Sequence, residues 1–276
     1  MSVQADHQQH PFHMVNPSPW PALGALAGLS LAVGAVFFFH NEPIFGIEGI
    51  YQLIPGFTLL ILTMILWWKD VIKESVNEKS HSEEVSSGLR MGMVLFIASE
   101  VMFFFAFFWA FFHHSLGASP STTEWPPIGI EVLDAWHLPF YNTVILLTSG
   151  VTVTRAHLYV EAGYNKKAAN WIWITAALGV LFLGLQAFEY GHAAFKLSDG
   201  VYPSTFYLAT GFHGFHVFVG TTFLIVCALR ASKNQFKPEK HIGFQSAAWY
   251  WHFVDVVWLF LFVWVYWLLG EPMRTF

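Results

Sequence analysis

Charged residues are scarce in this sequence. Lysine, arginine, aspartate and glutamate make up only 11% of its 276 residues, whereas hydrophobic residues make up 55% and the mean hydropathy is +0.49. So few charges cannot cover the surface of a water-soluble chain of this length. The composition therefore excludes an ordinary soluble globular protein and predicts a membrane protein. The formal net charge of -5 also argues against a nucleic-acid partner.

Cysteine is almost absent as well. The single cysteine, Cys227, lies inside an apolar run, which excludes a disulfide framework and a paired-cysteine metal site within the chain. The segment before the first apolar run has neither a basic leader nor a small-residue cleavage pattern, so we expect no cleavable signal peptide. Phenylalanine (29 residues) and tryptophan (13) are abundant, as is typical of a core and interface within a bilayer.

Long apolar runs dominate the chain. A helix that crosses a bilayer needs roughly 20 mainly apolar residues. This criterion predicts an all-α membrane protein with seven transmembrane helices, of which the fourth is the shortest. The expected spans are Trp20–His40, Ile50–Val71, Met91–Phe112, Phe140–His157, Ala168–Phe195, Ser204–Arg230 and Gly243–Gly270.

Basic residues set the expected orientation. All but two of the 13 lysines and arginines lie in or beside the loops after the second, fourth and sixth runs, the exceptions being Lys196 and Arg274. Short loops rich in these residues stay on the cytoplasmic or matrix side of a membrane. The pattern predicts a multi-pass protein with its N-terminus inside and its C-terminus outside.

One charged stretch interrupts the apolar pattern and indicates a division of the chain. It contains a pair of adjacent glutamates and several lysines, and it is typical of a solvated linker. We therefore expect a polar N-terminal tail at 1–19, a two-helix bundle at 20–75, a charged inner linker at 76–90 and a five-helix bundle at 91–276. The two bundles can diverge and leave a lipid-filled cleft.

Glu100 is the first of the ionisable residues expected within the bilayer. A charged side chain at mid-membrane costs roughly 2.5–3.5 kcal/mol on insertion scales, so such residues are rare without a use. The helical neighbours of Glu100 are Phe96, Phe103, Phe104 and Phe107. This apolar stripe favours the neutral form of the carboxyl and its reaction with reagents that seek buried protonated carboxyls. Glu100 serves either as a hydrogen-bonding partner of a neighbouring helix or in proton or lipid contact.

Asp255 is the second buried carboxyl that the sequence predicts. His252 precedes it by one helical turn on the same face, and we expect this pair to form an interhelical hydrogen-bonded clamp, because no nucleophile or metal-ligand set accompanies it. Glu189, near His192 at the outer end of the fifth run, is expected to reach interfacial water and carries no functional assignment.

Two histidines share one helix face within the sixth run. His213 and His216 are expected to be buried polar partners, able to face Glu100 or to hold a metal. Bis-histidine haem usually needs axial ligands from different elements, and a copper pair would be expected to use cysteine thiolates. The glycines at 211, 214 and 220 indicate close helix packing around the pair. We therefore expect no metal site and no redox centre in this chain.

Five stretches resemble one known family. They resemble subunit III of the haem-copper cytochrome c oxidases, in the order that this family has them, and the resemblance covers essentially the whole chain. The stretches are HMVNPSPWP at 13–21, WWKDV at 67–71, FIASEVMFF at 96–104, ATGFHGFHV at 209–217 and AAWYWHFVDVVW at 247–258.

The resemblance implies a fold and a function. The family folds as a two-helix and a five-helix bundle around a V-shaped, lipid-filled cleft in a bacterial or mitochondrial inner membrane. It has no catalytic residues, haem or copper of its own, because these belong to partner subunits I and II, which reduce O2 and pump protons in aerobic respiration. Subunit III is expected to stabilise subunit I, to support its proton uptake and to bind structural phospholipids. Membership of a respiratory supercomplex is left open.

The resemblance also assigns individual residues. Glu100 matches the family's buried, carbodiimide-reactive glutamate. Basic residues at the inner headgroup level suit lipid phosphates on charge grounds too. The positions that match phospholipid contacts in the cleft are Trp68, Lys73, His81, Phe96 and Arg230. The sequence departs from the family pattern at Arg155, Leu158, Gln245 and Ser246, which leaves any family role of those local contacts in doubt.

Three other functions are alternatives to this one. Subunit III of a quinol oxidase shares the last five helices but usually lacks the first two, and both of those runs are present here. A proton-coupled transporter would explain Glu100 and Asp255, but the inverted repeats and interrupted helices expected of one are not visible. A b-type haem protein stays open from the content of 14 histidines alone.

Overall fold

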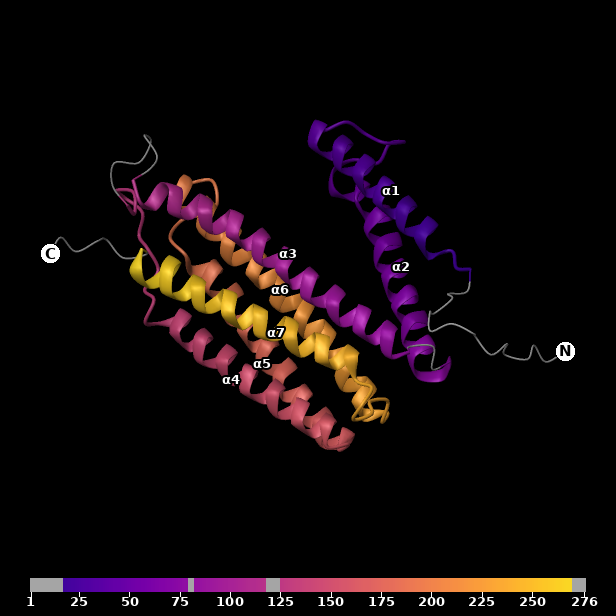
Figure 1. Ribbon diagram of the computed structural model, residues 1–276. Coiled ribbons are helices and arrows are strands. Elements are labelled where there is room, and N and C mark those ends of the chain that lie inside the picture. Colours follow the sequence, from indigo (N-terminus) through magenta and orange to yellow (C-terminus); the bar gives the residue numbers. More distant parts are fainter. Residues whose placement is uncertain (1–16, 79–81, 118–124, 270–276) are drawn as a thin grey trace. The chain divides into compact units, whose positions relative to one another are not determined.

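The computed structural model describes residues 17–78, 82–117 and 125–269, and the chain is helical through most of this part (Figure 1). Short helical turns at Gly49–Gln52, Glu74–Glu78 and Phe262–Leu268 flank the longer elements. The long helices are α1 (Trp20–His40), α2 (Ile54–Lys73), α3 (Glu83–Ser115), α4 (Leu138–Glu161), α5 (Asn165–His192), α6 (Val201–Ser232) and α7 (Ile242–Leu261).

The described residues contain six helices long and apolar enough to cross a membrane. The all-helical membrane class is therefore confirmed, and α1 has the bounds expected from its apolar run. The exception among the seven expected spans is α4, which is 24 residues long but does not meet the same apolar criterion. Its polar residues explain this, because Asn142, Thr143, Ser149 and Thr152 are all buried within the protein.

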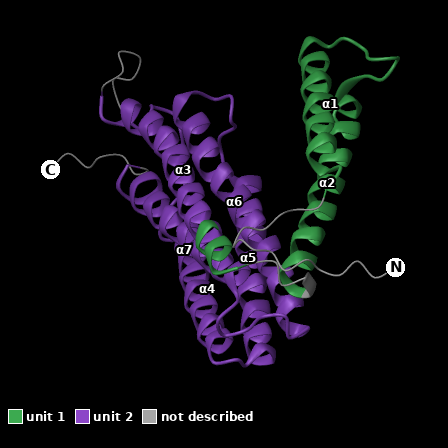
Figure 2. Cartoon of the chain, turned by 45° about the vertical axis from the view of Figure 1, so that its right-hand side comes forward, with its two compact units in different colours: residues 1–88 green, residues 89–276 purple. Residues whose placement is uncertain are grey.

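The chain divides into two compact units, Met1–Gly88 and Leu89–Phe276 (Figure 2). In the first unit α1 and α2 pack against each other as an antiparallel pair. Gly56 of α2 meets the backbone of Leu31, where a Cβ atom would lie 2.6 Å from the Leu31 nitrogen, so only glycine fits. Trp20 donates its indole N–H to the Asp70 carboxylate at 2.7 Å, which joins the start of α1 to the end of α2.

The start of α3 differs from the expected extent of the charged linker. We expected a solvated linker over 76–90, but α3 begins at Glu83, so the last part of that stretch is helical. The Ser82 hydroxyl accepts a hydrogen bond from the Val85 backbone N–H at 3.3 Å and thereby caps the helix. Glu83 and Glu84 also stand in the first turn, where negative charge is favourable. The Ser82 cap and the acidic first turn thus stabilise a helix in a segment whose high charge predicted a solvated linker.

The core of the second unit forms around α7. Trp251 and Trp258 are its largest fully buried side chains, and both indole N–H groups donate to α4, to the hydroxyls of Ser149 at 2.8 Å and Thr143 at 2.9 Å. Gly220 of α6 lies against Trp251, because a Cβ atom there would lie 2.9 Å from the indole ring. The close packing expected at Gly220 is thus present. At Gly214 the expectation was wrong, since an added Cβ would meet nothing within 4 Å.

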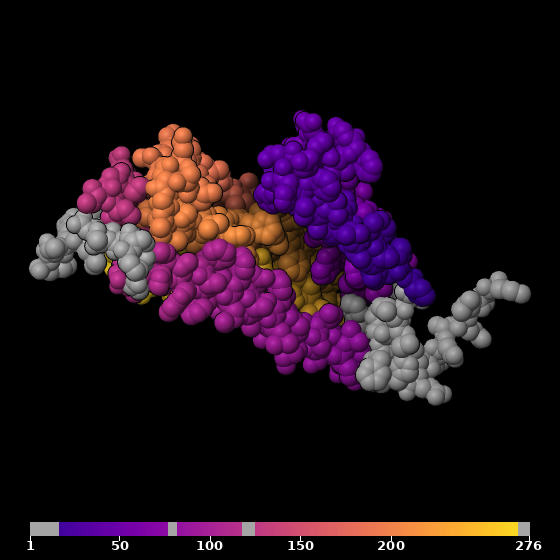
Figure 3. Space-filling view, turned by 90° about the horizontal axis from the view of Figure 1, so that it is seen from above, coloured from indigo at the N-terminus to yellow at the C-terminus, as the bar shows by residue number. Residues whose placement is uncertain are grey.

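Phenylalanine rings make many of the contacts of α3 with α6 and α7. Phe103 packs edge-on against Phe212 of α6 with ring centroids 5.1 Å apart, and Phe108 lies 4.4 Å from Phe260 of α7. In the space-filling view, α3 (magenta) lies directly against α6 (orange) (Figure 3). Large rings rather than small residues fill this interface, so α3 is held by aromatic packing.

One end of the second unit brings together the α4–α5 turn and the loop between α6 and α7. The Asn165 side chain donates to the Phe236 carbonyl at 2.8 Å, and Gly163 lies beside Pro238. Cys227 of α6 is fully buried near this end, with its sulfur 3.8 Å from the Gly243 carbonyl oxygen. These contacts hold the loop that leads into α7 against α5 and α6.

Candidate functional site

Glu100 of α3 faces His216 of α6. The Oε2 atom of Glu100 lies 3.0 Å from Nε2 of His216, and the two side chains are 20% and 8% exposed. Phe103 and Phe104 pack against the imidazole, with centroids 5.9 and 4.8 Å from it. The expected phenylalanine surround is present, and of the two candidate histidines it is His216 that Glu100 contacts.

A proton must lie between these two side chains. Nδ1 of His216 is 2.6 Å from the Phe212 carbonyl oxygen, which only accepts, so hydrogen bonding assigns a proton to Nδ1. The contact between Nε2 and the Glu100 oxygen then needs a second proton. Either a neutral carboxyl donates to a neutral imidazole, or an imidazolium donates to a carboxylate. The pair can therefore hold and exchange one proton within an apolar surround.

His213 lies on the same helix but has different partners. Its Nε2 atom is 3.2 Å from the Val254 carbonyl oxygen, and its ring packs against Phe182 and Trp258. The ring is almost fully buried. His213 and His216 therefore do not converge on a common metal position, although they share a helix face. Each imidazole instead hydrogen-bonds a different backbone carbonyl.

Asp255 and His252 lie between α7 and α4. The Asp255 carboxylate is 3.4 Å from Nδ1 of His252, and Nε2 of the same ring is 3.1 Å from the Thr154 hydroxyl of α4. Gly150 of α4 leaves the space that the carboxylate fills, since a Cβ there would lie 2.5 Å from Asp255 Oδ2. The geometry is that of a clamp between two helices.

The Asp255–His252 pair borders a surface hollow of about 520 Å³ between α4 and α7. Leu147, Val151 and Leu158 contribute the α4 side of its apolar lining, and Arg155 lies at the same surface. Val151 is 70% exposed and Leu158 is 54% exposed. A polar pair beside an exposed apolar hollow is typical of a surface that contacts another helix.

Glu189 has a role that the sequence did not indicate. We expected it to reach interfacial water, but only 4% of its surface is exposed. Its Oε1 atom accepts hydrogen bonds from the Tyr266 hydroxyl at 2.7 Å and from the Gln186 amide at 3.2 Å. Gln186 also accepts from Asn142 at 3.3 Å, so the network joins α4, α5 and the turn after α7. The amide residues Asn142 and Gln186 stand within long apolar runs of the sequence, and they could have indicated a buried hydrogen-bond network.

The residues expected to bind phospholipids lie on both units, and His81 falls outside the described residues. Trp68, Lys73 and Phe96 are exposed. Arg230 is half-buried, with its guanidinium 4.7 Å above the Phe236 ring, and its Nε atom has no hydrogen-bond partner among the described residues. A buried cation of this kind is suited to an anionic ligand such as a phosphate.

Comparison with known proteins agrees with the resemblance noted from the sequence. The chain matches the cytochrome c oxidase subunit III family over residues 10–269. It is 52% identical to cytochrome c oxidase subunit 3 of Arabidopsis thaliana over 266 residues, which cover 96% of this chain and 99% of the plant protein. The proteins of the same name from Scyliorhinus canicula and Danio rerio are 52% and 51% identical over 262 residues, covering 95% of this chain and 98% of each relative.

Both the extent and the identity of these matches show the family. The stretches that carry the resemblance include Glu100, His216 and Asp255. Glu100 of α3 contacts His216 of α6, and the Asp255 carboxylate of α7 packs against Gly150 of α4. The chain therefore belongs to the cytochrome c oxidase subunit III family.

Proposed function

We propose that this chain is a non-redox core subunit of cytochrome c oxidase that braces subunit I, binds phospholipids and supports proton uptake. As a member of this family it is a subunit of an oxidoreductase complex, and it is a multi-pass membrane protein. The quinol oxidase alternative is not favoured, since the relatives are cytochrome c oxidase subunits and the first two apolar helices are present.

The observation that carries the non-redox part of the proposal is how the two buried histidines are used. His213 and His216 each hydrogen-bond a backbone carbonyl of the protein, and His216 also contacts Glu100. Both ring nitrogens of His216 therefore have partners within the protein, and the buried ring of His213 packs against Phe182 and Trp258, so neither imidazole is presented to a haem. The haem and copper of the complex then belong to its partner subunits I and II, which carry out the reduction of O2.

The arrangement that we propose is a two-helix bundle at 20–75 and a five-helix bundle at 91–276, with phospholipids in a V-shaped cleft between them. The division of the chain into two compact units supports two separate bundles. Basic residues gather where the α4–α5 turn meets the loop between α6 and α7, namely Lys166, Lys167, Lys237 and Lys240. This supports placing that end inside, with the N-terminus, and the C-terminus outside.

The bracing surface that we propose is the hollow between α4 and α7. The exposed face of α4 combines the apolar residues Val151 and Leu158 with the polar residues Thr154 and Arg155, so a protein partner that offers polar groups suits this face better than lipid does. A partner helix that enters the hollow would cover Val151 and Leu158 and lie beside Asp255 and His252. A photo-crosslinker at position 151 should capture subunit I, whereas one at exposed Val180 of α5 should not; capture at 180 alone would contradict the assignment.

Proton uptake is the role that we propose for Glu100 and His216. Their 3.0 Å contact shares one proton between a carboxyl and an imidazole in an apolar surround, so the pair provides a place that can hold a proton. The chain thereby offers a proton-holding group without any catalytic residue of its own. This role supports the redox subunits and does not replace their chemistry.

Co-purification tests the main proposal. An affinity-tagged chain is solubilised in mild detergent and purified, and its reduced-minus-oxidised absorbance spectrum and co-purifying proteins are recorded. We expect haem bands and the two larger subunits, and slower proton uptake by the enzyme after this chain has been removed. A stable, colourless protein without partners would overturn the proposal. An untagged preparation is the control for carry-over.

A further inference from the structure

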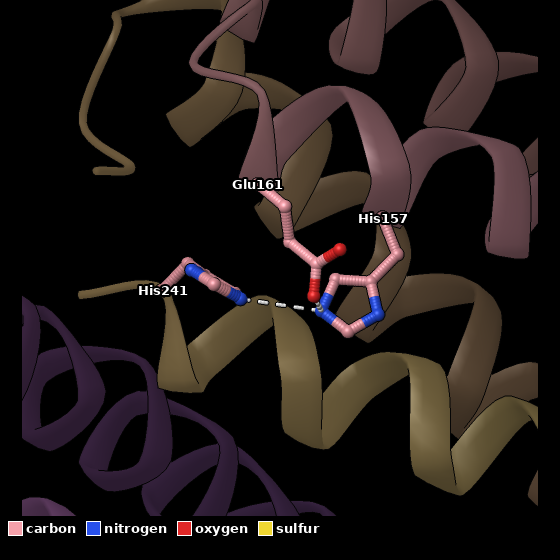
Figure 4. A group of neighbouring side chains, drawn as sticks. All are labelled: His157, Glu161 and His241. Atoms are coloured by element: carbon pink, nitrogen blue, oxygen red, sulfur yellow. Dashed lines mark hydrogen bonds and ion pairs between the residues drawn. The ribbon is translucent and has the colours of Figure 1, made fainter. Parts of the chain in front are cut away.

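A second group of ionisable side chains lies at the end of the second unit where α4 ends and α7 begins. His157 and Glu161 are one turn apart in the last turns of α4, and His241 immediately precedes α7. The Nε2 atoms of the two histidines are 3.2 Å apart, and Glu161 Oε1 is 3.9 Å from Nε2 of His157. Figure 4 shows the three side chains pointing toward one another.

The spacing of the three donor atoms fits a metal ion. One ligand atom from each residue lies within 4.8 Å of the others. Two nitrogens bound to one tetrahedral Zn²⁺ at about 2.0–2.1 Å lie about 3.3 Å apart, close to the separation of these two imidazole nitrogens. The carboxylate has to approach His157 by about 0.6 Å to reach the same separation, which rotation of the exposed Glu161 side chain allows.

The surrounding structure orients one of the two rings. Nδ1 of His241 is 3.1 Å from the Lys237 carbonyl oxygen, so it carries the proton and leaves the Nε2 lone pair directed at the cluster. The loop that holds His241 is itself fixed, since Asn165 donates to the Phe236 carbonyl. The ring of His157 packs against Phe244 at 5.7 Å. A hydrogen bond to the second ring nitrogen is the usual orientation of a metal-binding histidine.

We propose that His157, Glu161 and His241 bind a divalent transition-metal ion of the zinc class. Two imidazoles and one carboxylate are a ligand set that Zn²⁺ accepts, with a water molecule in the fourth position. The site opens to solvent, because the side chains of His157 and Glu161 are 22% and 53% exposed. A bound ion would join the end of α4 to the start of α7. It has no part in the proton-holding pair or the hollow described above.

Zinc binding by the assembled oxidase tests the proposal. Complexes that carry the wild-type chain or a variant are stripped with chelator and dialysed against radioactive Zn²⁺, and bound metal is counted per haem, which corrects for incomplete assembly. We expect His157→Ala and His241→Ala to lack one Zn²⁺ that the wild type holds. Glu161→Gln should bind that ion more than about tenfold more weakly, since even outer-shell changes cost 10–100-fold.

Two matched controls separate this site from adventitious surface binding. Glu239→Gln removes an exposed carboxylate from the same loop as His241, and His137→Ala removes an exposed imidazole at the start of α4. Both should bind zinc as the wild type does. Equal stoichiometry and affinity in wild type, Glu161→Gln and Glu239→Gln would overturn the proposal. Glu161→Gln also decides the matter if the histidine variants fail to assemble, because its side chain lies at the surface.

Discussion

The Glu100 carboxyl of α3 and the His216 imidazole of α6 are joined by a 3.0 Å contact that requires a proton between them. Nδ1 of His216 already donates its proton to the Phe212 carbonyl. The second proton therefore lies between Nε2 of His216 and the Glu100 carboxyl. The contact couples a helix held by aromatic rings to the tightly packed core of its unit. Its chemistry can be tested without measuring turnover.

The first prediction concerns the reactivity of the Glu100 carboxyl. A hydrophobic carbodiimide should label Glu100, because the reagent attacks protonated carboxyls in apolar surroundings, and Glu100→Gln should abolish the label. The glutamine amide still donates to His216, so the complex should assemble normally. Mass spectrometry of the α3 peptide measures the label. Glu131→Gln, at an exposed carboxyl, is the control, and labelling that persists in Glu100→Gln would contradict the assignment.

The second prediction compares two glycines of α6. Gly220→Ala should destabilise the protein by about 1–3 kcal/mol, because the new methyl group would lie 2.9 Å from the Trp251 ring, which is too close. Gly214→Ala should be neutral or stabilising by about 0.5–1 kcal/mol, because the methyl meets no neighbour and alanine is the better helix former. Denaturant unfolding in detergent measures both. Equal effects would show that Trp251 does not set the spacing of α6 and α7.

The third prediction concerns the buried network around Glu189. Tyr266→Phe removes the hydroxyl that donates to Glu189 at 2.7 Å and leaves the buried carboxyl with one donor fewer. We expect a loss of about 1–3 kcal/mol in the free energy of unfolding. Tyr141→Phe removes a hydroxyl from an exposed tyrosine of α4 and serves as the control. If both variants unfold at the same denaturant concentration as the wild type, the network does not stabilise the unit.

The fourth prediction concerns phospholipid binding at Arg230. Arg230→Ala should remove at least one phospholipid from the purified complex, because it deletes a half-buried cation stacked on Phe236. Lys233→Ala, which removes an exposed cation one turn later, should retain the full complement. Lipid phosphorus per haem and native mass spectrometry measure the difference. Equal lipid content in the two variants would remove Arg230 from the proposed set.

The sequence predicts correctly those features that depend on a single helix. The apolar run that predicted Trp20–His40 gave α1 its observed bounds. The phenylalanine stripe around Glu100 likewise follows from helical spacing, and the same rings pack against His216 in the structure. Both properties depend on the order of residues within one helix and need no knowledge of its neighbours.

Relationships between helices were not available from one sequence. Gly214 and Gly220 look equivalent in the chain, yet only Gly220 faces Trp251, because the rotation of α6 about its axis decides which glycine is covered. The same rotation brings His216 to Glu100 and turns His213 toward Val254. His157 and His241 are separated by 84 residues, so their contact depends on how the loops at one end of the unit meet.

The burial of the single cysteine has a practical consequence for labelling experiments. Cys227 of α6 is fully buried and faces the first residues of α7, so water-soluble maleimides do not reach its thiol. A cysteine introduced at any exposed position of this chain is therefore its sole modifiable thiol. The natural sequence thus already provides the background for spin labels, fluorophores and impermeant reagents.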